Sequence, residues 1–325
     1  MTTIPGGSGL ADTLTAEGRA VEAALERSLD ALLPLLPEGL RPPVRHGVLT
    51  GGKRLRPILA VTAFRACGGR EPTSIPDTPG GAGDGIGEGD GRLHDLAVSL
   101  ELIHAYSLMH DDLPCMDDAA LRRGRDTPHT LFGEGSTATA GAALIPAAGL
   151  YLLWSARAMG VPETDVLELL RILARAAGGG GMVGGQALDL EGEGRSLGRE
   201  ELDGLHRRKT GALLEASLEL GAVAAGADAP LRTAMTRYGR AIGLAFQIAD
   251  DILDATATRE VLGKAPSDAA LHKSTYVALL GVEGARAEAR SQVDLALEAL
   301  QAADLRLPAA SVLEELARFV VERDR

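Results

Sequence analysis

Residues 93–118 read LHDLAVSLELIHAYSLMHDDLPCMDD. Apolar side chains recur at helical spacing along this stretch until Pro114, so we predict a helix over 93–113 that the proline ends. Four aspartates gather at its end, at positions 111, 112, 117 and 118. Carboxylates this close repel one another, by about 1 kcal/mol per pair at 4 Å in water. A bound cation would explain the motif, and a solvated acidic turn is the alternative.

The spacing of two of these aspartates constrains the backbone. Asp111 and Asp117 are six positions apart, which in a regular helix puts them about 120° away from a common face. The chain must therefore leave the helix between them if both are to hold one ligand, and Pro114 supplies the break.

Composition favours an all-α fold. Aromatic residues make up 3% of the 325 residues, and the apolar residues are mostly Ala and Leu, which favour helices over strands. The formal net charge of −12 argues against nucleic acid or an anionic membrane surface as a partner. The two cysteines, Cys67 and Cys115, are too few for a disulfide framework and indicate reduced thiols in a cytoplasmic protein.

Helical periodicity recurs along the chain, and we expect helices at 9–27, 45–67, 93–113, 136–159, 163–177, 199–226, 230–256, 281–304 and 310–322. The N-terminus lacks the features of a signal peptide, and residues 1–8 are predicted to form a loose tail. Residues 71–92, rich in Gly and Pro, are predicted to be a flexible inserted loop. We expect one domain over 1–325.

One segment has the length of a membrane span. Residues 135–156 carry no charge, but Pro146, three glycines and several hydroxyls dilute their hydrophobicity. A helix that is buried on all sides, or that lies at a subunit interface, explains the segment better than a membrane span. We therefore expect no stable membrane insertion.

Two further motifs suit a charged ligand. GGKRLRP at 51–57 places Lys53, Arg54 and Arg56 beside two flexible glycines, a pattern that suits a phosphate but also occurs in solvated basic turns. FQIADDILD at 246–254 places Asp250 and Asp254 one helical turn apart, about 6 Å, among apolar residues. Two carboxylates at that spacing can share metal ions.

Two more motifs are weaker. Lys209-Thr210 begins a long apolar helix and could grip an anion, although a threonine that caps the helix is the commoner reason for such a pair. GMVGGQALDL at 181–190 contains glycines that cost about 1 kcal/mol each in a helix, so a close approach of the backbone to a neighbour or ligand is expected there.

Together, two aspartate motifs and two basic motifs predict Mg²⁺ ions that bridge carboxylates to an anionic, oxygen-rich ligand, because hard oxygen ligands without His or Cys clusters select Mg²⁺ over zinc. A diphosphate is the natural candidate for that ligand.

The motifs also resemble a known family. GGKRLRP, HDDLPCMDD with LRRG, GMVGGQALDL, KTGAL, FQIADDILD, LGK at 262–264, KSTY at 273–276 and the terminal ERDR occur in the same order in the short-chain trans-isoprenyl diphosphate synthases, most like the bacterial farnesyl diphosphate synthases. The resemblance covers about residues 40 to 325. One difference is Ala142, where the family usually has an aspartate after Gly141. Another is the 71–92 insertion, which is longer than the family's usual loop.

The resemblance implies an all-α isoprenoid-synthase bundle around a central cavity, usually a homodimer, and assigns site residues. The metal ligands would be Asp111, Asp112, Asp117, Asp250 and Asp254, with about three Mg²⁺ ions. The allylic diphosphate site would add Arg122, Lys209, Thr210, Gln247 and Lys264, and the isopentenyl diphosphate site would comprise Lys53, Arg56, His104 and Arg123. The residues that act most directly in catalysis would be Asp111, Asp117, Asp250, Lys209 and Arg122.

The implied reaction joins isopentenyl diphosphate to dimethylallyl or geranyl diphosphate by ionisation, condensation and elimination. Farnesyl diphosphate is the expected product because Tyr106, five positions before the first aspartate, and the adjacent Ser107 match the residues that limit chain length in the family. A core aromatic with no such role is the alternative for Tyr106. A geranylgeranyl or geranyl diphosphate synthase, a terpene cyclase and a non-catalytic synthase subunit are the competing functions.

Overall fold

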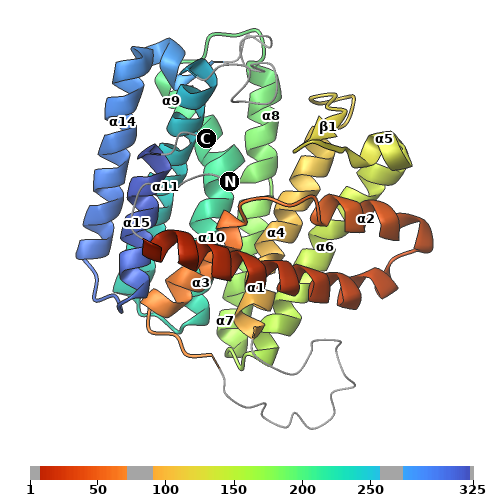
Figure 1. The fold of residues 1–325 in the computed structure, drawn as a ribbon, viewed down its shortest axis with the longest axis horizontal. Coiled ribbons are helices and arrows are strands. Elements are labelled where there is room, and N and C mark those ends of the chain that lie inside the picture. The colour runs from red at the N-terminus through yellow and green to blue at the C-terminus, as the bar shows by residue number, and fades with distance from the viewer. Residues whose placement is uncertain (1–7, 72–90, 257–273, 323–325) are drawn as a thin grey trace.

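The computed structural model describes residues 8–71, 91–256 and 274–322, and these ranges are almost entirely helical (Figure 1). The all-α prediction is confirmed. The helices of the N-terminal half are α1 (Ser8–Leu32), α2 (Arg41–Val48), α3 (Leu55–Ala66), α4 (Arg92–Asp111), α5 (Pro128–Phe132), α6 (Glu134–Ala158) and α7 (Glu163–Ala177), with short 3₁₀ turns at Leu33–Leu35 and Glu38–Leu40. The C-terminal half holds α8 (Met182–Gly192), α9 (Arg199–His206), a π-helical turn at Arg207–Gly211, α10 (Ala212–Ala224), α11 (Ala229–Thr256), α14 (Tyr276–Gln301) and α15 (Ala309–Glu322).

The expected single helix over 45–67 is wrong. α2 ends at Val48 and α3 begins at Leu55, because Gly51 and Gly52 adopt positive φ values of 78° and 143°. These values lie outside the helical region. The chain thus forms an irregular turn at the point where the basic motif lies.

Several elements were not foreseen, among them the short helix α5. The glycine-rich stretch 181–190 begins at the N-cap of α8 and lies within that helix. A two-stranded hairpin, β1 (Leu121–Arg122) and β2 (Arg125–Asp126), follows the first aspartate motif. Its turn residues Arg123 and Gly124 have φ values of 54° and 75°. Positive φ at both central residues is the conformation that closes a two-residue hairpin.

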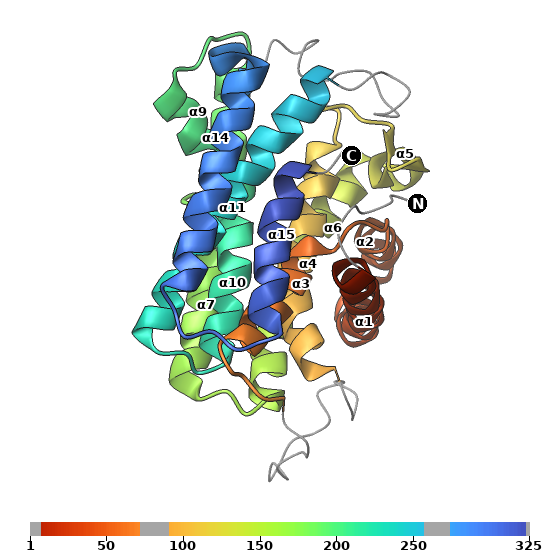
Figure 2. The same ribbon diagram turned by 60° about the vertical axis from the view of Figure 1, so that its left-hand side comes forward.

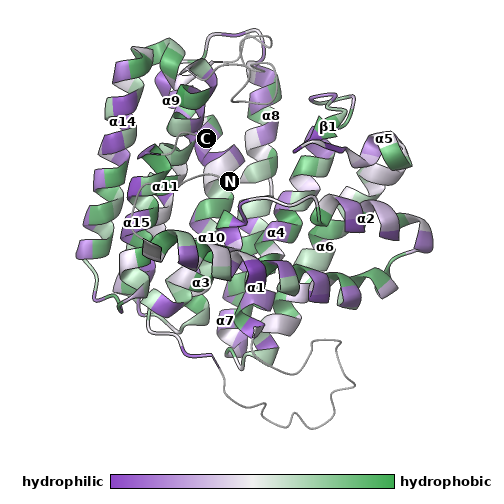
Figure 3. Cartoon of the chain, in the orientation of Figure 1, coloured by the Kyte–Doolittle hydropathy of each residue, from purple (hydrophilic) through white to green (hydrophobic). Residues whose placement is uncertain are grey.

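α10 lies at the centre of the bundle because it is apolar on two sides. Leu213 and Leu220 pack into a core shared with α1, α4, α6 and α7, while Leu214 and Leu218 pack into a second core with α3, α11, α14 and α15. α1 lies across α3 and α4 on one face of the molecule, as Figures 1 and 2 show. In Figure 3, α10 is largely green, whereas purple residues recur along α1 and α14.

The two helices that carry the aspartate motifs run in the same direction. α4 and α11 both end at the upper end of the bundle in Figure 1, where the hairpin and α8 also lie. Asp111 is the last residue of α4, and Asp250 and Asp254 lie in the last two turns of α11. The fold thus brings the two motifs to one end of the molecule.

α6 is, within the described ranges, the one helix that is long and apolar enough to cross a membrane. Only 44% of its most apolar window is buried inside the chain. The helix is therefore not buried on all sides, and side chains such as Ile145, which is 40% exposed, leave it an open apolar face.

Candidate active site

The first aspartate motif folds back on itself after α4 ends. The Asp117 N–H donates to the Asp111 carbonyl at 2.9 Å, and the Ala119 N–H donates to the Asp112 carbonyl at 3.2 Å. These bonds replace helical ones from Pro114 onward. Asp111 and Asp117 consequently lie within electrostatic reach of each other. The predicted departure from the helix is confirmed.

Asp111 lies in an environment that opposes its negative charge. Burial, together with the charges of Asp117 and Asp112, raises the pKa of its carboxyl to about 6, although Lys209 and Arg122 act in the opposite direction. Two nearby cations thus fail to offset burial and two neighbouring carboxylates. A divalent cation would offset them, so hard oxygen donors and unfavourable negative charge at Asp111 fit a Mg²⁺ site.

Asp112 has a different neighbour from Asp111. Its side chain is 2% exposed, and both carboxylate oxygens accept from Arg122 Nε, at 2.8 and 2.9 Å. Arg122 Nη2 approaches Asp112 Oδ1 at 2.6 Å. This bidentate pair orients Arg122 on the hairpin. The carboxylate of Asp112 is thus paired with Arg122, and its role as a metal ligand stays a prediction.

A buried ion pair lies beneath the basic turn. Arg54 has a φ of 49°, which is costly for a residue with a side chain. Its guanidinium donates to Glu101 Oε1 at 2.7 Å, to Glu22 Oε1 at 2.8 Å and to the Val48 carbonyl at 3.1 Å. The side chains of Arg54 and Glu101 are each 4% exposed. These bonds hold the turn between α2 and α3 in its irregular conformation.

Arg56 and Arg123 lie within electrostatic reach of Glu101, and His104 lies within reach of both arginines. The charge of Glu101 raises the pKa values of Arg56 and Arg123, although burial lowers both more strongly. Burial, and then the charges of Arg56 and Arg123, hold the pKa of His104 well below its usual range, so this imidazole is neutral. The structure therefore brings together Arg56, His104 and Arg123, three of the four residues that the resemblance assigns to isopentenyl diphosphate. We call Arg54, Arg56 and Arg123 around Glu101 the arginine cluster.

The turn and the hairpin are joined within this cluster. Arg123 Nη1 donates to the Gly51 carbonyl, and a side chain at Gly52 would place its Cβ 2.5 Å from Arg123 Nη1. The guanidinium thus lies against the backbone at Gly52, whose φ of 143° itself favours glycine. Arg56 Nε is buried and has no hydrogen-bond partner among the described residues.

Lys53, the fourth assigned residue, is exposed at the turn. It lines an apolar cavity of about 730 Å³ between α1, α3, α11 and α15, together with Phe246 of the second aspartate motif. Lys53 thus borders a large apolar cavity, whereas Arg56 and Arg123 are not among the residues that line it.

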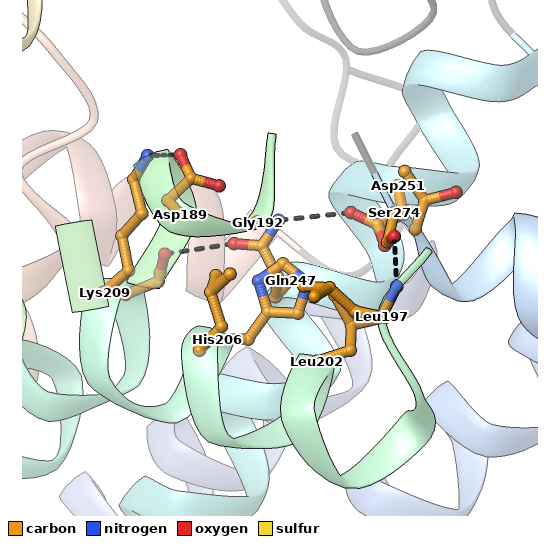
Figure 4. Close-up of a pocket in the computed structure, with 12 residues that line it drawn as sticks. Asp189, Gly192, Leu197, Leu202, His206, Lys209, Gln247, Asp251 and Ser274 are labelled. Carbon is orange, nitrogen blue, oxygen red and sulfur yellow. Dashed lines mark hydrogen bonds and ion pairs between the residues drawn. The ribbon is translucent and has the colours of Figure 1, made fainter. Parts of the chain in front are cut away.

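Lys209 and Thr210 lie on the π-helical turn, at the wall of a small polar cavity (Figure 4). Lys209 Nζ forms an ion pair with Asp189 Oδ2 at 2.5 Å, and Thr210 Oγ1 donates to Gln247 Oε1 at 3.0 Å. His206 lines the same cavity, and burial lowers its pKa to about 4. Lys209, Thr210 and Gln247 are therefore brought together as the resemblance implied.

α8 can approach this turn because it is built on glycine. A Cβ at Gly185 would lie 2.1 Å from the backbone nitrogen of Lys209. The expected close backbone approach in the stretch 181–190 is thereby confirmed. This approach brings Asp189 to Lys209. Asp189 was not predicted as a site residue, although it is the only charged residue in the stretch 181–190.

Asp250 and Asp254 are half-buried on α11, and Asp251 between them is 3% exposed. Over the described ranges, no three His, Cys, Asp or Glu side chains converge closely enough to hold a metal ion alone. A ligand that supplies its own oxygen atoms would therefore have to bridge the two aspartate motifs. Lys264 lies outside the described residues.

Tyr106 points toward α6. It is 9% exposed, its ring contacts that of His110 edge-on at 4.7 Å, and a Cβ at Gly141 would lie 3.7 Å from its Cδ2. Burial, and then the charge of Asp111, raise the pKa of its hydroxyl. Ser107 Oγ donates to the His104 carbonyl at 2.9 Å. Tyr106 is a core residue within reach of the aspartates, and its role in chain length stays a prediction.

Comparisons with known proteins agree with this arrangement. The model of the polyprenyl synthetase family matches residues 37–311. The farnesyl diphosphate synthase of Escherichia coli (strain K12) is 41% identical over 285 residues, which cover 87% of this chain and 88% of that protein. The chloroplastic geranylfarnesyl diphosphate synthase of Leucosceptrum canum is 40% identical over 307 residues, which cover 93% of this chain and 78% of that protein.

A solved structure extends the similarity to the fold. The apo FPP/GFPP synthase from Zymomonas mobilis superposes with a TM-score of 0.76 at 34% identity, covering 96% of this chain and 99% of that one. Fold and site together define an all-α isoprenoid synthase. The chain belongs to the polyprenyl synthetase family and is a prenyltransferase.

Proposed function

We propose that the protein condenses isopentenyl diphosphate with dimethylallyl or geranyl diphosphate and releases farnesyl diphosphate. The observation that carries this proposal is the presence of two separate cationic sets at one end of the bundle, each suited to one diphosphate. Arg56, His104 and Arg123 form one set beside Glu101. Lys209, with Thr210 and Gln247, forms the other beside Asp111.

Each set has a distinct task in this reaction. Lys209 and Arg122 offset negative charge as the allylic diphosphate departs, which is the charge that grows in the transition state. Arg56 and Arg123 hold the second diphosphate, and neutral His104 contributes one N–H donor without adding charge. The double bond of isopentenyl diphosphate then attacks the allylic cation, and the released diphosphate takes the final proton. Apolar walls must exclude water, which would quench the cation.

Magnesium fits the aspartate end of this site. Family members generally use Mg²⁺, and we propose that about three ions are held by Asp111, Asp117, Asp250 and Asp254 together with the diphosphate. When bound, Mg²⁺ supplies Lewis-acid neutralisation of the leaving diphosphate. The raised pKa of Asp111 is the observation in favour, since it indicates local negative charge that lacks compensation.

We further propose a cytoplasmic homodimer, with the open face of α6 against a second copy. Ala142, Ile145 and Pro146 are exposed on that face. Ala142 stands where the family usually has an aspartate, which makes the face more apolar. Light scattering of the purified protein tests the oligomeric state, and Ile145→Arg should produce monomers if this face is the interface.

The proposed reaction is tested by incubating purified protein with Mg²⁺, isopentenyl diphosphate and each allylic starter, and then sizing the products. A fifteen-carbon product supports the proposal. Mainly ten- or twenty-carbon products would support the geranyl or geranylgeranyl alternatives. A cyclic hydrocarbon formed without isopentenyl diphosphate would instead indicate a terpene cyclase, and no product from any starter would indicate a non-catalytic subunit.

A further inference from the structure

A chain of hydrogen bonds runs from Thr210 into the interior of the protein. Thr210 Oγ1 donates to Gln247 Oε1 at 3.0 Å, and Gln247 Nε2 donates to Asp251 Oδ1 at 3.2 Å (Figure 4). The Tyr276 N–H donates to the other oxygen, Asp251 Oδ2, at 2.8 Å. Gln247 and Asp251 are one helical turn apart on α11. Asp251 is thus directed toward buried groups, although it lies between two aspartates that we assign to the metals.

The chemistry of these groups fixes the direction of each bond. An ionised carboxylate can only accept hydrogen bonds, so the Gln247 amide must turn its nitrogen toward Asp251. The amide oxygen then faces Thr210, and because that oxygen can also only accept, Thr210 must give its single proton to it. The Thr210 hydroxyl therefore directs its oxygen lone pairs, and not its proton, toward the cavity beside Lys209.

We propose that Asp251 is a positioning residue that sets, through Gln247, the direction of the Thr210 hydroxyl, so that oxygen lone pairs face the electron-poor end of the allylic substrate. The inference rests on the proposed function, in which that end becomes positively charged as diphosphate leaves. A lone pair stabilises such a charge, whereas an O–H dipole pointing at it would oppose it. Preorganised dipoles in a site of low dielectric commonly change rates by about 10²-fold.

Asp251 can serve this purpose because its other oxygen has a fixed partner. Tyr276 is held at three points: its hydroxyl donates to Asp203, its ring stacks on His206 with a centroid separation of 5.7 Å, and it begins α14 after Thr275, whose side chain accepts from the Ala278 N–H. The Tyr276 N–H therefore holds the Asp251 carboxylate in one orientation.

The substitution Asp251→Asn reverses the direction of the hydrogen bonds between Asp251, Gln247 and Thr210 with little change in side-chain shape. The introduced amide keeps its oxygen toward the Tyr276 N–H and presents its NH₂ group to Gln247, whose own amide then turns and donates to Thr210. The hydroxyl proton of Thr210 is thereby directed into the cavity. We expect kcat to fall about 10- to 100-fold, with the KM for isopentenyl diphosphate within about twofold of wild type.

Two further variants separate this role from a merely structural one. In a Thr210→Val background the hydroxyl is absent, so adding Asp251→Asn should reduce kcat by less than about twofold. In Asp251→Asn/Gln247→Glu the total charge is that of wild type and the introduced carboxylate again accepts from Thr210, so kcat should recover at least about tenfold over Asp251→Asn alone. Asp203→Asn is the matched control: the introduced amide oxygen can still accept from the Tyr276 hydroxyl, and the hydrogen bonds from Asp251 to Thr210 keep their direction, so kcat should stay within about twofold of wild type.

The test measures kcat and KM of the wild type and of these variants with geranyl diphosphate and isopentenyl diphosphate, together with their melting temperatures. An active wild type with an equally active Asp251→Asn overturns the inference, and so does a loss that persists undiminished in the Thr210→Val background. A wild type that forms no prenyl product from any starter contradicts the proposed function instead.

Discussion

The arginine cluster and the two aspartate motifs lie at the same end of the bundle, but their charges are balanced in different ways. Arg54 and Glu101 neutralise each other in the interior, at 2.7 Å and 4% exposure each. Asp111 and Asp117 lie close together, and burial with mutual repulsion raises the pKa of Asp111 to about 6. One region is therefore preorganised by the protein, whereas the other is completed only by a cation or ligand.

The largest expected effect on turnover comes from substitutions in the two aspartate motifs. Asp111→Ala or Asp250→Ala should lower turnover by about three orders of magnitude, because each removes a ligand at the leaving diphosphate, where electrostatic stabilisation is worth several kcal/mol. Circular dichroism should show an intact fold in both variants. Turnover of wild type should vanish in EDTA and return with added Mg²⁺, and near-normal turnover in EDTA would contradict the role of the metal.

The next effect distinguishes the two regions by substrate. Arg56→Ala should raise the KM for isopentenyl diphosphate about 10- to 100-fold, and Lys209→Ala should do the same for geranyl diphosphate, because each cation is assigned to a different diphosphate. Initial rates at varied concentrations of each substrate measure the separation. Equal effects on both KM values in either variant would show that the two sets act as one site.

Stability should move in opposite directions in the two regions. Glu101→Gln leaves the buried Arg54 without its full counter-charge and should cost about 1–3 kcal/mol of unfolding free energy. Asp111→Asn relieves a buried carboxylate that lacks compensation and should add about 1–2 kcal/mol. Urea unfolding without Mg²⁺ measures both. Asp95→Asn removes another buried carboxylate of α4, which pairs with the part-exposed Arg27 of α1. Because burial raises the pKa of Asp95, its loss should cost less stability than the loss of Glu101, and this variant is the control for removing any buried carboxylate.

Sequence analysis predicted the long elements because their apolar periodicity is uninterrupted. The helix over 163–177 matches α7, and that over 93–113 ends within two residues of α4. The expectation over 45–67 failed because apolar residues stand on both sides of the basic motif, at 48–49 and 58–61, while the backbone between them is turned by Gly51 and Gly52 and held by Arg54. Periodicity reports which side chains are buried, but it carries little information about a positive φ.

The site was foreseen in its residue types but not in its supporting contacts. Arg56, His104 and Arg123 could be assigned by resemblance, whereas Glu101 at their centre looks like any charged residue on a helix in the sequence. Asp251 received no role from the sequence, and its burial and its bonds to Gln247 and Tyr276 distinguish it from the neighbouring Asp250. Partners that are distant in sequence decide these roles, so a motif alone does not reveal them.

The smallest expected change in rate concerns Tyr106, which belongs to neither charged region. The growing chain must extend away from the metals, and Tyr106 lies on α4 before Asp111, packed on His110 and facing Gly141 of α6. Removing its ring opens space along that path, so Tyr106→Ala should make longer products than wild type while turnover stays within about fivefold, because no charged group is touched. The lost packing should cost about 3 kcal/mol of stability.

Tyr106→Phe is the matched control, since it removes only the hydroxyl and should keep the fifteen-carbon product. Product sizing after incubation with excess isopentenyl diphosphate provides the measurement. If the products of Tyr106→Ala keep the wild-type length, Tyr106 is only a core aromatic, and the limit to elongation must lie elsewhere along the wall between α4 and α6. If they lengthen, chain length is set by the size of an apolar side chain, independently of the charges that drive the chemistry.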